Sequence, residues 1–209
     1  MPRARLSQED QDILSKLREG GVLREIQPAM MPKHTGTIHV PCSDGERIRD
    51  MLSHHWDTCD GGRNCHHTPA LNGGPLLIPL YSPVRRYTRD DIDPQAVELL
   101  GPDDLREDRV LLYHARKGCQ IKGVGTVVLE GHAPCGMAYT AGLNVLEVLE
   151  LLFEAKQVVR TFIPNKTVMC KLHVEYHENK LRTYFLNRRT WQEWCDENQT
   201  YIAQFAKAA

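Results

Sequence analysis

Two short motifs contain the side chains best suited to chemistry in this sequence. Cys42 and Asp44 lie in the motif C-S-D, and His132 and Cys135 lie in the motif H-x-x-C-G. Each motif follows an apolar segment that predicts a strand, so if these strands are neighbours in one sheet, their ends bring the side chains together. Two thiolates and one imidazole are a Zn²⁺ ligand set, and three protein ligands leave the fourth position of the metal open. The alternative is a set of core residues without a metal, since free cysteine is among the most buried residue types.

A second group of cysteine and histidine residues lies in a segment rich in Gly, Asn and Asp. Its members are Cys59, Cys65, His66 and His67. Their spacing, C-x5-C-H-H, matches no common zinc motif, so we expect an irregular loop rather than a second metal site. The remaining cysteines are expected to be packing residues: Cys119, Cys170 and Cys195.

The composition is that of an ordinary globular protein. The chain has 209 residues, 41% of them hydrophobic, which excludes disorder over its whole length. The 26 Lys and Arg residues nearly balance the 27 Asp and Glu residues, so binding to nucleic acid is not expected. No apolar run reaches the roughly 20 residues that cross a bilayer, and the first residues lack the apolar core of a secretory signal. We therefore expect a cytoplasmic protein, in which cysteines serve thiolate chemistry rather than disulfides.

Strands are predicted where short apolar runs end at turn residues or at one of the two motifs. The predicted strands are Thr37–Pro41, Pro75–Tyr81, Thr126–Leu129, Val168–Tyr176 and Leu181–Leu186. The last two flank the sequence HENK and are therefore expected to form an antiparallel hairpin. Three successive apolar residues in the run TVVL indicate a strand that is buried on both faces of a parallel sheet.

Helices are predicted where apolar residues recur at helical spacing or where capping residues occur. The predicted helices run from Ser7 to Gly20, from Ile48 to His55, from Asp93-Pro94 onward, from Gly142 to Arg160 and from Thr190 onward. Strands and helices alternate along most of the chain. This order predicts an α/β fold with a mainly parallel sheet flanked by helices and an antiparallel C-terminal hairpin at the edge of the sheet.

The order of these features resembles the β-class carbonic anhydrases. The similarity extends over residues 37–187, with a strand and CSD, a long insertion, a strand and GHAPCGM, a long apolar helix and a hairpin. GHAPCGM is the most specific part. The resemblance implies an N-terminal helical arm (1–36), a β-carbonic-anhydrase-like zinc domain (37–189) and a C-terminal helix (190–209). It also implies a homodimer or a higher homo-oligomer.

The resemblance implies a role for each residue of the two motifs. Cys42, His132 and Cys135 would bind Zn²⁺, and Asp44 would form a dyad with an arginine. The implied reaction is the reversible hydration of CO2 to bicarbonate by a zinc-bound hydroxide, because zinc lowers the pKa of bound water from about 15.7 toward about 7. The carboxylate would orient the hydroxide, and the arginine would hold the carboxylate away from the metal.

One departure from the family pattern concerns this arginine. The family reads C-x-D-x-R, whereas this sequence reads C-S-D-G-E-R, with Glu46 at the expected position and Arg47 one residue later. A bulge at Gly45 would restore the pairing, so Arg47 is the expected partner of Asp44, with Arg49 as the second choice. An Arg-Asn-Ala-Gly stretch that is common in the family is also absent, and either RNCHH or ALNGG stands in its neighbourhood.

Two other functions fit the same residues. A hydrolase of the same fold, acting on carbonyl sulfide or carbon disulfide, would use the same metal site behind a narrower and more apolar entrance. If no arginine reaches Asp44, its carboxylate becomes a possible fourth zinc ligand. The protein would then be a catalytically silent zinc-binding protein.

Overall fold

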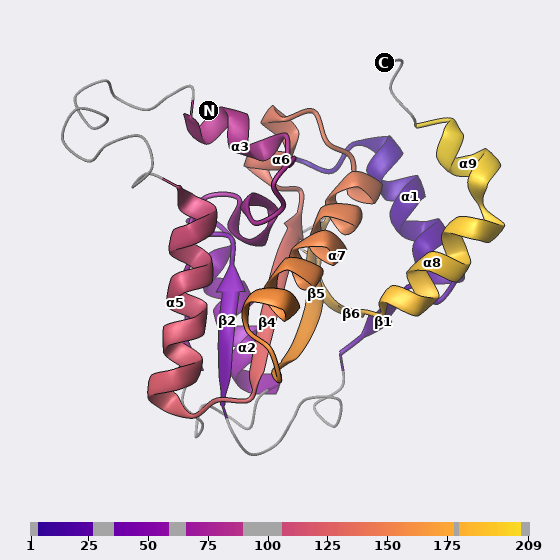
Figure 1. Ribbon diagram of the computed structural model, residues 1–209. Coiled ribbons are helices and arrows are strands. Elements are labelled where there is room, and N and C mark those ends of the chain that lie inside the picture. The colour runs from indigo at the N-terminus through magenta and orange to yellow at the C-terminus, as the bar shows by residue number, and fades with distance from the viewer. Residues whose placement is uncertain (1–3, 27–35, 59–65, 90–105, 178–179, 206–209) are drawn as a thin grey trace.

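The fold is built on one mixed sheet of six strands. The computed structural model describes residues 4–26, 36–58, 66–89, 106–177 and 180–205, and Figure 1 shows their arrangement. The strands are β1 (Leu23–Glu25), β2 (Thr37–Pro41), β3 (His66–His67), β4 (Thr126–Ala133), β5 (Thr167–Tyr176) and β6 (Lys180–Leu186). Their order across the sheet is β1-β6-β5-β4-β2-β3. The pairs among β3, β2, β4 and β5 are parallel, and β6 is antiparallel to both β5 and β1.

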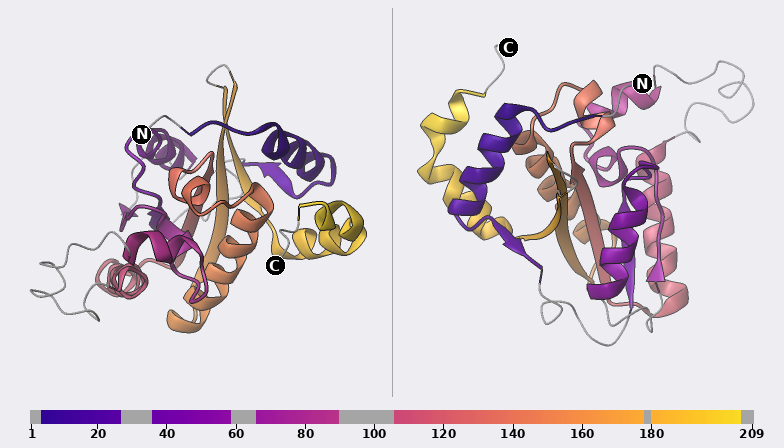
Figure 2. Two further views of the ribbon diagram at one scale, coloured as in Figure 1. Left: turned by 90° about the horizontal axis from the view of Figure 1, so that it is seen from above. Right: turned by 180° about the vertical axis from the view of Figure 1, so that it is seen from behind.

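Helices cover both faces of the sheet. They are α1 (Gln8–Glu19), α2 (Ile48–Thr58), the 3₁₀ helix η2 (Gly74–Leu77), α3 (Val84–Arg89), α5 (Glu107–Lys122), α6 (Gly136–Thr140), α7 (Val145–Phe162), α8 (Arg188–Glu197) and α9 (Gln199–Ala203). In Figure 1, α5 and α7 lie in front of the sheet, and the view from behind in Figure 2 shows α2 in front of the other face. Among the described residues, no helix has the length and apolar character that a membrane span requires.

The two faces of the sheet differ in chemistry. On the face under α7, a Cβ atom added to Gly131 would lie 2.9 Å from the side chain of Leu152, so helix and strand pack closely there. On the face under α2, His39 and Glu130 are fully buried and hydrogen bonded to each other. The apolar layer therefore provides the main core, while the buried polar side chains of the other layer must form hydrogen bonds with one another.

The predicted α/β sheet with a parallel core and an antiparallel hairpin is confirmed. Ser7 caps α1 by accepting a hydrogen bond from the Asp10 amide at 2.9 Å, and Asn144 begins α7 with a capping box. β1 and α5 were not predicted from the sequence. β1 pairs with β6 and adds the outermost strand beyond the hairpin.

Two sequence predictions near β3 need correction. Pro75–Tyr81 is not a strand, and its first residues belong to η2, because Gly73 and Gly74 turn the chain at positive φ and two prolines cannot donate to a strand ladder. His66–His67 was expected in an irregular loop, yet its backbone pairs with β2. The helix predicted at Asp93-Pro94 and the hairpin turn at 178–179 lie outside the described residues.

Candidate metal centre

The topology of the sheet brings the two motifs together. β2 and β4 are parallel neighbours, so the residues that follow them emerge at the same edge of the sheet. Cys42 directly follows β2, His132 is the next-to-last residue of β4, and Cys135 is the N-cap residue of α6. The ligand atoms of these three side chains lie within 4.8 Å of one another, and all three residues are buried. A single divalent ion can be reached from all three at once.

The orientation of His132 suits a metal ligand. Its Nδ1 lies 2.9 Å from the carbonyl oxygen of Pro134, which assigns the N–H to Nδ1. The other ring nitrogen, Nε2, is buried and has no hydrogen-bond partner among the described residues. A buried nitrogen lone pair without a partner is unfavourable unless something binds it, and a metal ion would do so.

The two thiols are paired in a way that favours one thiolate. A hydrogen bond from Cys42 lowers the pKa of Cys135 well below its usual value, although burial opposes this, and His132 lowers it further. The same contact with Cys135, together with burial, raises the pKa of Cys42. Cys135 is therefore the more acidic thiol of the pair. A divalent ion bound by both residues would displace any proton that a thiol holds, because thiolates are the ligands.

A glycine pair supports Cys42 from a third segment of the chain. The Gly73 amide donates a hydrogen bond to Cys42 Sγ at 3.2 Å, and the Ser43 amide donates to the Leu71 carbonyl at 2.9 Å. Gly74 has φ +50°, and a Cβ atom there would lie 2.6 Å from the Cys42 nitrogen. Of the two segments considered from the sequence, ALNGG therefore lies at the site. In the sequence, only the two adjacent glycines indicate that this segment could lie against another backbone, because glycine allows such a close approach.

Asp44 is paired with Arg47 beside the three ligand-type residues. The Arg47 Nη1 donates to Asp44 Oδ2 at 3.2 Å. The same oxygen lies 3.9 Å from His132 Nε2. Asp44 does not belong to the group whose ligand atoms all lie within 4.8 Å of one another. The carboxylate is thus near the candidate metal position but turned toward the guanidinium.

The additional residue in C-S-D-G-E-R is absorbed by a turn at the start of α2. The amides of Arg47 and Ile48 donate to the Asp44 carbonyl at 3.0 and 2.8 Å, and the Glu46 amide donates to Asp44 Oδ1 at 3.0 Å. Gly45 is not among the residues with positive φ, so the pairing does not depend on a left-handed glycine. The turn itself brings Arg47 back over Asp44.

Arg47 is held by partners that the sequence did not indicate. Its side chain is only 3% exposed; Nε lies 3.0 Å from Glu175 Oε2, and Nη2 donates to the Ala4 carbonyl at 3.1 Å. Glu175 comes from β5 and Ala4 from the segment before α1. Arg49, the second choice for the dyad, is exposed. The geometry favours Arg47 as the partner of Asp44.

A second buried group with ligand-type atoms lies on the polar face of the sheet. His39 donates to Glu130 at 2.6 Å, His55 lies 2.7 Å from the Thr37 hydroxyl, and the rings of His39 and His55 stack with centroids 4.0 Å apart. Lys171 Nζ lies 3.2 Å from His55 Nδ1. Burial alone would raise the pKa of Glu130, but Lys171 and the hydrogen bond from His39 lower it to about 2. A lysine already supplies the positive charge, so this group is a hydrogen-bonded polar core rather than a metal site.

The other cysteines that the structure describes take no part in the candidate centre. Cys119 and Cys170 are buried, and Cys195 is half-buried on α8. Burial raises the pKa of Cys170 to about 12, so it stays a thiol. Cys59 and Cys65 lie outside the described residues, so the prediction that their group is not a second metal site stays untested.

Comparison with known proteins finds similarity only at the level of structure. No family model matches the sequence, and no curated protein matches it. A β-carbonic anhydrase, isoform I, from Trichomonas vaginalis is similar in structure with a TM-score of 0.37 and 13% identity, over 87% of this chain and 99% of that chain. A carbonic anhydrase from Streptococcus mutans is similar with a TM-score of 0.37 and 12% identity, over 88% and 100% of the two chains. Such low scores transfer no residue role or activity to this chain.

Proposed function

We propose that this protein is a zinc-dependent lyase that hydrates CO2 to bicarbonate. The observation that carries the proposal is the convergence of Cys42, His132 and Cys135 at one sheet edge, with Asp44 held beside them by Arg47. The motifs C-S-D and GHAPCGM, which resemble those of β-class carbonic anhydrases, support the same reaction. The substrates are the small molecules CO2 and bicarbonate.

The donor set fits zinc, which the sequence and the geometry favour over a harder cation. Two sulfur ligands and one imidazole nitrogen suit Zn²⁺, whereas Mg²⁺ and Ca²⁺ prefer oxygen ligands. Zinc bound by these three residues would act as a Lewis acid and lower the pKa of a water molecule toward neutrality. A fourth protein ligand is not required.

The surrounding residues would hold the site ready for this chemistry. Asp44 accepts hydrogen bonds and would orient a water molecule next to the ion. The Arg47 guanidinium lies 3.2 Å from Asp44 and would keep the carboxylate from becoming a ligand. The hydrogen bond between His132 Nδ1 and the Pro134 carbonyl fixes the tautomer, and the Gly73 amide fixes Cys42.

A catalytically silent zinc protein is the second candidate function. It is favoured by the 3.9 Å separation between Asp44 Oδ2 and His132 Nε2, because a small rotation of the carboxylate would bring it to the ion. The Arg47 pairing opposes that rotation. Hydrolysis of carbonyl sulfide or carbon disulfide would use the same residues, and no described contact distinguishes it from CO2 hydration.

Stopped-flow CO2 hydration by the zinc-loaded protein tests the proposal. We expect activity in the wild type and none in Cys42→Ala or Cys135→Ala, with Cys119→Ala as a matched control that removes a buried thiol outside the candidate ligand group. Sulfide release from carbonyl sulfide is measured in parallel. Full zinc occupancy without hydration from acid to alkaline pH would favour the silent protein, and sulfide release without bicarbonate formation would favour the hydrolase.

A further inference from the structure

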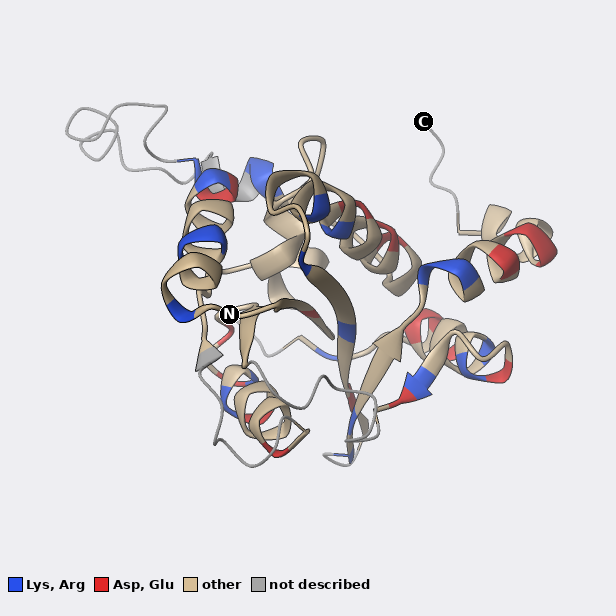
Figure 3. Cartoon of the chain, turned by 60° about the horizontal axis from the view of Figure 1, so that its bottom comes forward, with Lys and Arg blue, Asp and Glu red and all other residues tan. Residues whose placement is uncertain are grey.

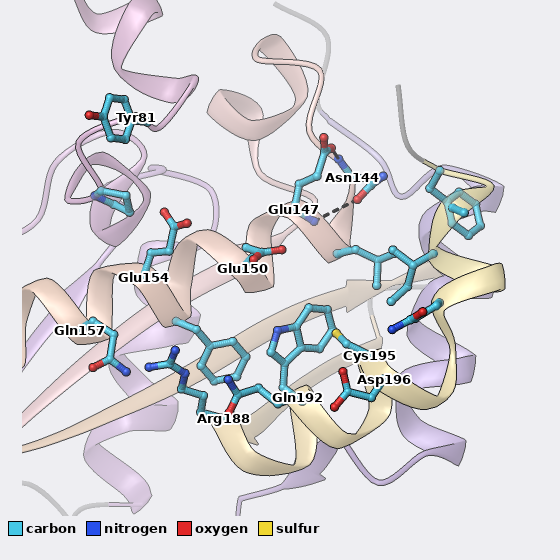
Figure 4. A pocket seen from close by; sticks show the side chains of 18 of the residues that line it. Tyr81, Asn144, Glu147, Glu150, Glu154, Gln157, Arg188, Gln192, Cys195 and Asp196 are labelled. Atoms are coloured by element: carbon cyan, nitrogen blue, oxygen red, sulfur yellow. Dashed lines mark hydrogen bonds between the residues drawn. The ribbon is translucent and has the colours of Figure 1, made fainter. Parts of the chain in front are cut away.

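A groove of about 1070 Å³ lies between α7 and the C-terminal helices α8 and α9. Figure 4 shows it from close by. Its floor is apolar and includes the rings of Phe153 and Trp191, whose centroids are 6.0 Å apart. Leu80 and Tyr81 line one end and are 60% and 90% exposed. An apolar groove with exposed large side chains at its end is typical of a surface that binds a partner.

The rim of this groove is acidic. Glu147, Glu150 and Glu154 follow one another at three- and four-residue spacing along α7, and Asp196 faces them from α8 (Figure 4). Among the described residues that line the groove, Arg188 is the one basic side chain. Glu150 and Glu154 are exposed and form no ion pair within the described part of the chain. We call this surface the acidic groove.

The exposed side of α5 has the opposite charge. Val110, Tyr113 and Ile121 are 41%, 54% and 81% exposed and lie on one face of the helix together with Lys117. The exposed basic residues of α5 are Arg109, Arg116, Lys117 and Lys122. No exposed residue of this helix is acidic. We call this surface the basic stripe, and Figure 3 shows blue segments along α5 and red segments along α7.

We propose that the basic stripe of one copy of this chain docks in the acidic groove of a second copy. Both surfaces combine exposed apolar side chains with charge, and their charges are opposite. Their spacing also corresponds, because Arg109 and Arg116 are separated by the same seven residues as Glu147 and Glu154. In a helix this is about 10 Å in each case.

The basic stripe and the acidic groove lie on different sides of α7. In Figure 1, α5 lies on one side of α7, and α8 and α9 lie on its other side. One chain therefore cannot satisfy its own groove, and the contact is head-to-tail. Such a contact adds further copies until a ring closes or a filament grows. Neither surface contains a residue of the candidate metal centre, so assembly and zinc binding can be tested separately.

Sedimentation velocity of the full-length zinc-loaded protein tests this assembly. We expect the mean mass of the wild type to rise over about a hundredfold range of protein concentration and to fall as salt is added. The groove variant Glu150→Lys with Glu154→Lys should associate at least about tenfold more weakly, and so should the stripe variant Arg116→Glu with Lys117→Glu. The control Glu193→Lys reverses a charge on the exposed side of α8 outside the groove and should behave as the wild type.

A mixture of the two charge-reversed variants tests whether the basic stripe is what binds in the acidic groove. Each variant alone has like charges on both surfaces, whereas in the mixture each stripe meets a groove of opposite charge, so association should return to within about threefold of the wild type. Failure of the mixture to associate would overturn the proposal. A wild type that stays at the mass of a single chain over this concentration range would also overturn it, and binding of a Lys/Leu amphipathic peptide by such a protein would assign the groove to another protein instead.

Discussion

The substitution Arg47→Met separates the two roles that the structure gives to this guanidinium. Arg47 is 3% exposed and contacts three carboxylates, Asp44 at 3.2 Å, Glu175 at 3.0 Å and the exposed Glu46 at 3.6 Å, besides the Ala4 carbonyl at 3.1 Å. Methionine preserves much of the volume but removes the charge. Asp44 and Glu175, whose side chains are only 19% and 13% exposed, would then lose their cation.

The expected loss of stability follows from these contacts. Removal of one partner from a largely buried ion pair lowers the free energy of unfolding by about 3–5 kcal/mol. We expect a loss of this size in urea unfolding of the zinc-loaded protein. Arg49→Met is the matched control, because it removes the same charge from an exposed position of the same helix, and it should change stability by less than about 0.5 kcal/mol.

The expected loss of activity comes from Asp44. Without Arg47, the carboxylate is free to rotate toward His132 Nε2, 3.9 Å away, and to occupy the open position of the ion. CO2 hydration should fall at least about 100-fold, equivalent to about 2.7 kcal/mol, while zinc content stays close to that of the wild type. The reasoning is refuted if Arg47→Met retains zinc and hydrates CO2 within twofold of the wild type, or if Arg49→Met loses as much activity.

Further predictions concern the polar core and the glycine pair. Glu130→Gln should lower the free energy of unfolding by about 3–5 kcal/mol at pH 7, because Lys171 then loses its buried counter-charge. The pKa of Glu130 is about 2 in the folded state, whereas its ordinary value is 4.5. The difference in free energy of unfolding between the wild type and Glu130→Gln should therefore be complete above pH 4.5 and disappear as the pH falls toward 2. A difference that stays constant down to pH 2 in urea unfolding contradicts this. Gly74→Ala should weaken zinc retention during titration with a chelator at least about tenfold, because its Cβ atom would lie 2.6 Å from the Cys42 backbone and φ is +50°. Gly45→Ala, with open space around the position, is the control, and equal zinc retention by the two variants would count against the role of the glycine pair.

The candidate ligands could be brought together from the sequence because a simple rule connects them. Both motifs follow strands, and the carboxyl ends of parallel neighbours meet at one edge of a sheet. The structure has β2 and β4 as such neighbours, and it brings Cys42, His132 and Cys135 together. That they bind zinc stays a prediction.

The supporting residues could not be predicted, because distant segments supply them. Glu175 reaches Arg47 only because β5 lies beside β4, and nothing in its local sequence marks it. Gly74 lies against Cys42 through a turn at positive φ, which hydrophobic periodicity does not report. The apolar content of Pro75–Tyr81 predicts a strand, but the prolines and the preceding glycines at positive φ produce η2 instead.

The short strand β1, at the edge of the sheet, could not be predicted from its local sequence either. Leu23–Glu25 has three residues with no alternation of apolar and polar side chains. It is a strand because its backbone pairs with β6, with Leu23 opposite Leu186. Tertiary pairing, rather than local propensity, determines such a segment.

X-ray absorption spectroscopy at the zinc edge tests the metal centre most directly. We expect one zinc ion per chain whose nearest neighbours are two sulfur atoms at about 2.3 Å, one imidazole nitrogen at about 2.0 Å and one oxygen atom. The oxygen signal should persist in Asp44→Ala, whose side chain has no oxygen, because the signal belongs to solvent and not to the carboxylate. A spectrum with no sulfur or only one, or a protein that takes up no zinc, would contradict the proposed centre.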